Sequence, residues 1–234
     1  MPYYQPQSAW ETALATVSEM GGRAGRNAGR WLRGRYVNRC MADFDRRLAI
    51  LGPGSVCLDL GANVGTMTLR MAATGALVHA YEPDPFAFGE LQRNVGHLPN
   101  VVLHQAAVAA VGGAGVLQRL NDFADDPFAK STMSSLIPIY PSIYEGGEAI
   151  PVETRAFRDV LDGIGGPVAM LKMDIEGSEF EILRAIFADP AAFDIDAIFC
   201  ETHEYAFIEQ KPEVERMRRV SEALARPYIN LYWP

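Results

Sequence analysis

The sequence contains few cysteines and no long apolar run. Its three cysteines, Cys40, Cys57 and Cys200, form no C-x-x-C pair, so we expect neither a disulfide framework nor a zinc site. No apolar stretch approaches the roughly 18 residues of a membrane span, and the N-terminus lacks a charged segment followed by an apolar one, the order of a signal peptide. These features predict a soluble, cytoplasmic protein without membrane contact.

Positive charge is scarce outside the N-terminal segment. The chain carries a net charge of −8, and residues 1–50 hold eight arginines against four acids, a net +4 that leaves −12 for the remainder. An acidic body of this kind argues against extended contact with nucleic acid. The arginines between positions 23 and 39 form either a solvated helix face or a contact for an anionic partner.

A tight glycine turn follows the first strand that the sequence predicts. The apolar run 56–60 passes through GANVG at 61–65 directly into a helical pattern. Glycines permit backbone dihedrals closed to other residues and leave space for a ligand against the loop. The loop lacks the central glycine of G-x-G-x-x-G, which argues against a nicotinamide-dependent oxidoreductase. We therefore expect a small-molecule cradle.

Strands and helices alternate along most of the chain. Apolar patterns predict strands at 56–60, 77–81, 101–104, 167–173, 195–200 and 228–232, with helices at 66–73, 86–97, 159–164, 178–187 and 213–225. Two further helices precede them, separated by a break at Gly21, Gly22 and Gly25, and Ser178 with Glu181 predicts a capping box. The alternation indicates an α/β fold, with a mostly parallel central sheet and helices on both faces.

Residues 111–157 interrupt this alternation. Strand character at 116–120 and 152–157 flanks a segment rich in Ser, Pro, Tyr and Asp, and loops this long are usually functional or disordered. With Tyr140 and Tyr144 available for stacking on an acceptor, residues 120–150 form either a lid or a plain insertion. The predicted organisation is a helical extension at 1–52 and an α/β domain at 53–234 that contains this insertion.

Polar residues follow several predicted strands at the edge where parallel sheets bind ligands. Glu82 can accept hydrogen bonds from two ribose hydroxyls, or it can be an N-cap acid, a role that Asp84 serves equally. Asp174 and Glu176 repel each other unless a cation or substrate relieves them. Lys172, within an apolar run, is expected to reach a carboxylate or the rim of the sheet.

His203 is the candidate general base of this edge. Glu201 would hold its imidazole in one tautomer, and the alternative is a histidine on a surface loop. Asp174, Glu201 and His203 could instead bind a divalent cation that lowers the pKa of an acceptor. The sequence leaves both routes open.

Four motifs resemble the FkbM-type S-adenosylmethionine-dependent methyltransferases. They are LDLGANVGTMTL at 58–69, EPDP at 82–85, LKMDIEGSEFEIL at 171–183 and ETHE at 201–204. The resemblance implies a Rossmann-like class-I methyltransferase fold over 53–234. The wider class-I sheet ends in a strand hairpin, whereas one strand follows 195–200 here, so the strands near 116 and 152 are candidates for completing the sheet.

The resemblance also implies S-adenosylmethionine as the cofactor. The glycine loop would hold its methionine moiety, Glu82 its ribose and the turn at 105–107 its adenine. The implied binding residues are Asp59, Gly61, Ala62, Asn63, Gly65, Glu82, Pro83, Gln105, Ala106, Asp174 and Glu176. Acids among them suit a cationic sulfonium, although Asp59 can equally be a structural acid that bonds loop amides.

The expected function is O-methylation of a hydroxyl on a small molecule, in natural product biosynthesis or on a sugar, with His203, Asp174 and Glu201 as catalytic residues. The alternative is a non-catalytic cofactor-binding or partner subunit of the same fold. Nothing in residues 120–150 names the acceptor. Trp10 and Trp31 would either form a partner surface, as in a homo-oligomer, or belong to helices that fold over the crevice.

Overall fold

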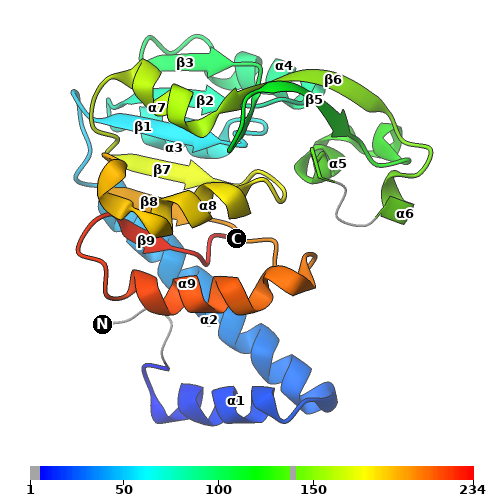
Figure 1. The fold of residues 1–234 in the computed structure, drawn as a ribbon, viewed down its shortest axis with the longest axis vertical. Coiled ribbons are helices and arrows are strands. Elements are labelled where there is room, and N and C mark those ends of the chain that lie inside the picture. Colours follow the sequence, from blue (N-terminus) through cyan, green and yellow to red (C-terminus); the bar gives the residue numbers. More distant parts are fainter. Residues whose placement is uncertain (1–5, 138–140) are drawn as a thin grey trace.

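Six parallel strands form the centre of the molecule in a computed structural model that describes residues 6–137 and 141–234 (Figure 1). Their order is β3-β2-β1-β7-β8-β9. The strands are β1 (Val56–Leu60), β2 (Leu77–Tyr81), β3 (Val101–His104), β7 (Met170–Met173), β8 (Ala197–Cys200) and β9 (Tyr228–Asn230). The strand order reverses between β1 and β7, and the ends of strands at such a reversal leave room for a ligand.

One face of the sheet is covered by α2 (Gly22–Leu48), α3 (Thr66–Ala72) and α4 (Pro85–Val95). Phe44 of α2 and Met71 of α3 pack on Cys57 and Phe199. Leu91 of α4 packs near Ala80 and Ala62. Alternate residues of each strand face this layer because successive side chains of a strand point to opposite faces.

The other face is covered by α7 (Phe157–Ile164), α8 (Glu179–Ala188) and α9 (Lys211–Ser221) (Figure 1). Val160, Ile182 and Met217 of these helices pack on Leu58 and Leu171. Each fully buried side chain of this kind contributes about 1.5–3 kcal/mol. The predicted α/β architecture, with helices on both faces of a parallel sheet, is confirmed.

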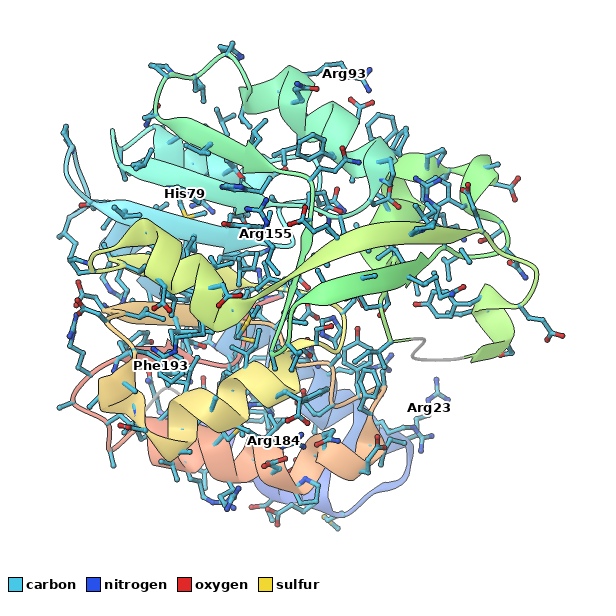
Figure 2. The ribbon with its side chains drawn as sticks, turned by 45° about the horizontal axis from the view of Figure 1, so that its top comes forward. Arg23, His79, Arg93, Arg155, Arg184 and Phe193 are labelled. Atoms are coloured by element: carbon cyan, nitrogen blue, oxygen red, sulfur yellow. The ribbon has the colours of Figure 1, made fainter. Side chains whose placement is uncertain are left out.

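A helical hairpin precedes the sheet and extends beyond it (Figure 1). The helix α1 (Ala9–Glu19) is joined to α2 by a turn at Gly21, where φ is 70°. The predicted break at Gly25 is wrong. Gly25 is buried within α2, and a Cβ there would lie 3.1 Å from the carbonyl oxygen of Ser18. Gly25 therefore lets the two helices pack closely, and Arg23 marks the far end of α2 in Figure 2.

The inserted strands form a separate sheet. The strands β4 (Ala107–Ala109), β6 (Ala149–Ala156) and β5 (Gly113–Gln118) lie in that order, so they do not complete the main sheet. Short helices lie between β5 and β6, namely η1 (Phe123–Asp125), α5 (Pro127–Lys130), η2 (Ser131–Met133) and α6 (Pro141–Tyr144). Tyr140, assigned to the lid, lies outside the described residues. Among those described, no helix is both long enough and apolar enough to cross a membrane.

Candidate active site

A cavity of about 400 Å³ lies outside the carboxyl ends of β1, β2 and β7. Most of the predicted binding residues line it, namely Gly61, Ala62, Asn63, Glu82, Pro83, Ala106, Asp174 and Glu176. The exceptions are Asp59, Gly65 and Gln105, which are absent from its walls. Gln105 is exposed, and its neighbours Ala106 and Ala107 line the cavity in its place.

The two loop glycines serve different purposes. Gly61 has a φ of 75°, and a Cβ there would lie 1.8 Å from the carbonyl oxygen of Asp174. Gly65 has a φ of 92°, and its Cβ would lie 2.8 Å from Leu91 of α4. Gly61 thus lets the loop meet the end of β7 at the cavity wall, whereas Gly65 permits helix packing behind the loop.

Asp59 is a structural acid below the loop. It is fully buried, and its Oδ2 accepts a hydrogen bond of 2.7 Å from the hydroxyl of Thr68, at the start of α3. Asp59 therefore bonds a side chain of the following helix. The sequence had suggested a bond to backbone amides of the loop as one possibility. Lys172 lies 3.5 Å from Asp59 and 3.6 Å from Asp174, and donates to the carbonyl of Gly61 at 2.6 Å. The expectation that Lys172 reaches a carboxylate is confirmed.

The ionisation of Lys172 follows from these contacts. Burial opposes its charge, but Asp174 and Asp59 outweigh burial and raise its pKa above the usual range. A charged Lys172 ties the glycine loop of β1 to the acid at the end of β7. Lys172 lines the first cavity, but its ammonium group is engaged by Gly61, Asp59 and Asp174, so it stabilises the loop.

Glu82 forms the wall of the cavity next to the loop. Its Oε2 accepts from the backbone N–H of Asn63 and its Oε1 from that of Asp84, both at 2.8 Å. Burial raises its pKa to about 7 although these two hydrogen bonds oppose the shift. The N-cap of α4 is Asp84, whose Oδ1 accepts from Phe86 at 2.8 Å. The N-cap interpretation of Glu82 is wrong, and each of its oxygens keeps a further lone pair for a ligand.

A second cavity, of about 350 Å³, adjoins the first. Asp174 and Glu176 line both cavities. The second is also lined by Thr132, Met133, Ile143, Tyr144, Glu201, His203, Tyr205 and Pro234. The three predicted catalytic residues therefore lie together beside the predicted cofactor pocket.

His203 is buried at the inner wall of this second cavity, with 1% of its surface exposed, so the surface-loop interpretation is wrong. Its Nδ1 lies 2.9 Å from Oε1 of Glu179, and its backbone N–H donates to the same oxygen at 3.1 Å. Its Nε2 lies 3.4 Å from Glu176 and 3.8 Å from Asp174. Burial lowers the pKa of His203, but Glu176 and Glu179 outweigh it and raise the pKa to about 11.

Glu179, not Glu201, orients the imidazole. It is fully buried, and its other oxygen accepts from the backbone N–H of Gly177 at 2.8 Å. The predicted capping box of Ser178 and Glu181 is wrong, because Ser178 has helical dihedrals and its side chain makes no cap hydrogen bond. The bond from Gly177 to Glu179 stands at this end of α8 instead. The sequence did not identify Glu179 as the partner of His203, although Glu179 stands in the KMDIEGSE block. Several acids in that block could have held the imidazole equally well.

Glu201 faces α2 of the N-terminal extension. Burial, and then Asp174, raises its pKa to about 7. Arg33 of α2 lies 3.8 Å from Glu201, and its guanidinium lies 5.6 Å from the ring centre of Tyr205. The helical extension thus reaches the second cavity. The sequence singled out Arg33 only as one of the arginines between positions 23 and 39, and it did not point to Glu201, which is far away in the chain.

The insertion lies against both cavities. Asn63 of the glycine loop donates to the hydroxyl of Ser131 at 3.3 Å, and Ser135 donates to the carbonyl of Glu176 at 2.7 Å. Glu176 has a φ of 51°, a left-handed conformation that is rare outside glycine. Residues 120–150 therefore contact the site as the lid prediction requires, and whether they open stays a prediction. A further cavity is lined by His79 and Arg155, both labelled in Figure 2, and it shares Tyr81 with the first cavity.

Comparison with known proteins decides the family. The family model described as the methyltransferase FkbM domain matches residues 59–226, which include the glycine loop, Glu82 and His203. The chain belongs to the FkbM methyltransferase domain family. The resemblance of its four motifs to that family is thereby confirmed.

Two curated relatives of this FkbM-domain chain illustrate its similarity. It is 27% identical over 173 residues to a 31-O-demethyl-FK506 methyltransferase FkbM of Streptomyces tacrolimicus, covering 64% of this chain and 65% of that protein. It is 26% identical over 165 residues to Methyltransferase 1 of Beauveria bassiana, covering 64% of each. The matches thus span slightly less than two thirds of these relatives.

Proposed function

We propose that this FkbM-domain protein methylates a hydroxyl oxygen of a small molecule, with S-adenosylmethionine as the methyl donor. One observation carries the proposal. A cavity with a glycine loop and a carboxylate adjoins a second cavity with an imidazole, and the two share Asp174 and Glu176. This arrangement would place a donor and an acceptor on either side of one acidic junction.

The residues of the first cavity fit the cofactor. Its volume of about 400 Å³ is in the range of small-molecule sites. Glu82 offers a lone pair on each oxygen for the two ribose hydroxyls. Asp174 and Glu176 supply negative charge for the sulfonium. Lys172 already pairs with Asp59 and Asp174, whereas a phosphate-containing ligand would need a lysine that is not paired. When bound, the cofactor supplies an activated methyl group.

The chain's own residues would position the acceptor. In the second cavity the acceptor oxygen would form a bond to the methyl carbon as the methyl–sulfur bond breaks, and its proton would pass to a group in the wall. His203, Asp174 and Glu201 stay the predicted catalytic residues. Alignment in such a displacement can contribute effective molarities of about 10⁵ M or more.

The acceptor class is proposed from the same cavity. Tyr144 and Tyr205 lie in its wall, and aromatic rings suit contact with the faces of sugars or polyketides. The name of the Streptomyces relative specifies an O-demethyl substrate. Both features favour a hydroxyl on a natural product or sugar.

A methyl-release assay tests the proposal. Purified protein would be incubated with S-adenosylmethionine and panels of alcohols, sugars, phenols, amines and thiols, and formation of S-adenosylhomocysteine would be followed. We expect turnover with a hydroxyl-bearing acceptor. Cofactor binding without turnover on any panel would favour the non-catalytic subunit, and turnover restricted to amines or thiols would refute O-methylation.

A further inference from the structure

We infer that Asp174, Glu176 and His203 form a binding site for a divalent cation at the junction of the two cavities. Each residue offers one ligand atom, and these atoms lie within 4.8 Å of one another. Around an octahedral ion with bonds of about 2.1 Å, neighbouring ligands lie about 3.0 Å apart and opposite ligands about 4.2 Å apart. Small side-chain movements would bring the three atoms into that range.

The orientation of His203 supports a ligand role independently of the acids. The ring is 1% exposed, and Glu179 holds its Nδ1 at 2.9 Å. Its Nε2 therefore points at Glu176 and Asp174, but from 3.4 Å and 3.8 Å, beyond the 2.7–3.2 Å of ordinary hydrogen bonds. A histidine whose second nitrogen is fixed by a carboxylate is the usual arrangement of a metal-bound imidazole.

The local charge favours the same occupant. Carboxylates of Asp174, Glu176, Glu179 and Glu201 gather around His203. Among the described residues, the cationic side chains nearby are Lys172, which Asp174 shares with Asp59, Arg33, whose side chain is 47% exposed, and His203 itself, which would lose its proton to bind the ion. Acids packed this closely repel one another unless a cation relieves them. A ligand set of carboxylates and one imidazole suits Mn²⁺ or Mg²⁺, and the imidazole favours Mn²⁺.

The consequence for chemistry rests on the proposed function. A cation here would lie between the methyl donor and the acceptor, where it could lower the pKa of a bound hydroxyl. Glu201 lies in the same wall without belonging to the set of three ligands. It would be free to take the hydroxyl proton.

Binding of Mn²⁺ to the full chain, in the absence of S-adenosylmethionine, tests the inference directly. The signal of free Mn²⁺ in electron paramagnetic resonance would be titrated with wild-type protein and with Asp174→Asn and Glu176→Gln. We expect one tightly bound ion per wild-type chain and affinity at least about tenfold weaker in each variant. Omitting the cofactor excludes its sulfonium as the occupant.

The matched control is Glu181→Gln, which removes an acid on α8 with a side chain that is 66% exposed. It should bind Mn²⁺ as the wild type does. Absence of tight binding to the wild type, or equal affinity in wild type and both folded site variants, would overturn the inference. Because Glu176 and Asp174 are partly exposed, both variants should fold, and circular dichroism checks this.

The proposed function can fail separately. Glu82→Gln, in the cofactor cavity, should leave Mn²⁺ affinity intact while it weakens cofactor binding. Mn²⁺ binding without any methyl transfer would refute the function and keep the cation site. Methyl transfer by a protein that does not bind Mn²⁺ would refute the cation site and keep the proposed function.

Discussion

The carboxylate of Glu82 accepts a hydrogen bond from the backbone N–H of Asn63 at 2.8 Å. This bond joins the acid that follows β2 to the glycine loop that follows β1, so the two parts of the cofactor pocket are held together before any ligand binds. Preorganisation of this kind lowers the entropic cost of binding. It also means that substitutions at either residue should affect the other.

The burial of Glu82 predicts a dependence of stability on pH. Its pKa is raised from 4.5 to about 7 in the folded protein, so the folded state binds this proton more tightly than the unfolded state. The stabilisation is complete below pH 4.5 and is lost as the pH rises through about 7. From about pH 5 to pH 8 the wild type should lose about 1–3 kcal/mol relative to Glu82→Gln. Urea unfolding of both proteins measures this difference, and parallel curves would contradict it.

Substitution of Gly61 should cause a severe steric clash. Gly61→Ala would place a Cβ 1.8 Å from the carbonyl of Asp174 at a φ of 75°, and we expect a loss of more than about 3 kcal/mol in unfolding free energy. Gly54→Ala is the matched control, since Gly54 has a φ of 94° with no atom within 4 Å. It should cost about 1 kcal/mol. Equal losses in urea unfolding would show that the contact with Asp174 is unimportant.

Substitution of His203 should lower turnover without changing the affinity for the cofactor. Once an acceptor is found, His203→Gln should lower turnover by about 10²–10⁴-fold, the usual effect of losing an acid, base or metal ligand. Affinity for S-adenosylhomocysteine should be nearly unchanged, because His203 lies in the second cavity alone. His97→Gln, at an exposed position, is the control. Unchanged turnover in His203→Gln would remove this residue from the mechanism.

The contacts of Glu11 should stabilise the helical hairpin of α1 and α2. It is 1% exposed and accepts hydrogen bonds from Arg39 at 2.6 Å and Arg35 at 3.1 Å. Glu11→Gln removes the carboxylate that both arginines share and should destabilise the hairpin by about 1–3 kcal/mol. Faster amide hydrogen exchange in α1 would report it. The exposed neighbour Glu19 provides the control, and no difference between Glu11→Gln and Glu19→Gln would contradict the prediction.

Acid should weaken the same contact. Arg39 in particular lowers the pKa of Glu11 from 4.5 to about 2. The stabilisation is therefore present above pH 4.5 and is lost as the pH falls toward 2. The protection factors of α1 amides, which correct for the slower intrinsic exchange in acid, should fall over that interval in the wild type and much less in Glu11→Gln.

The sequence predicted those parts of the site that strand ends determine. Hydrophobic periodicity located the strands, and the rules of parallel sheets then placed Gly61, Glu82 and Asp174 at one edge. Lys172 was predictable because a buried ammonium needs partners. These inferences depend on local pattern and on topology, and both are readable from one chain.

Other features depend on which side chains meet in three dimensions. Glu179 took the role expected of Glu201 because the first turn of α8 passes behind His203. Arg33 reaches the second cavity only because α2 crosses the sheet in that direction. The separate sheet of β4, β6 and β5 likewise depends on pairing between distant segments, which periodicity does not specify.

Calorimetric titration with S-adenosylmethionine tests the central claim, that the crevice beside the glycine loop is the cofactor site. The account predicts one binding site per wild-type chain. Glu82→Gln should weaken binding by about 10–100-fold, because each hydrogen bond to a charged group is worth about 1.5–3 kcal/mol. A wild-type chain that binds no S-adenosylmethionine, or a Glu82→Gln variant that binds it equally well, would contradict the account.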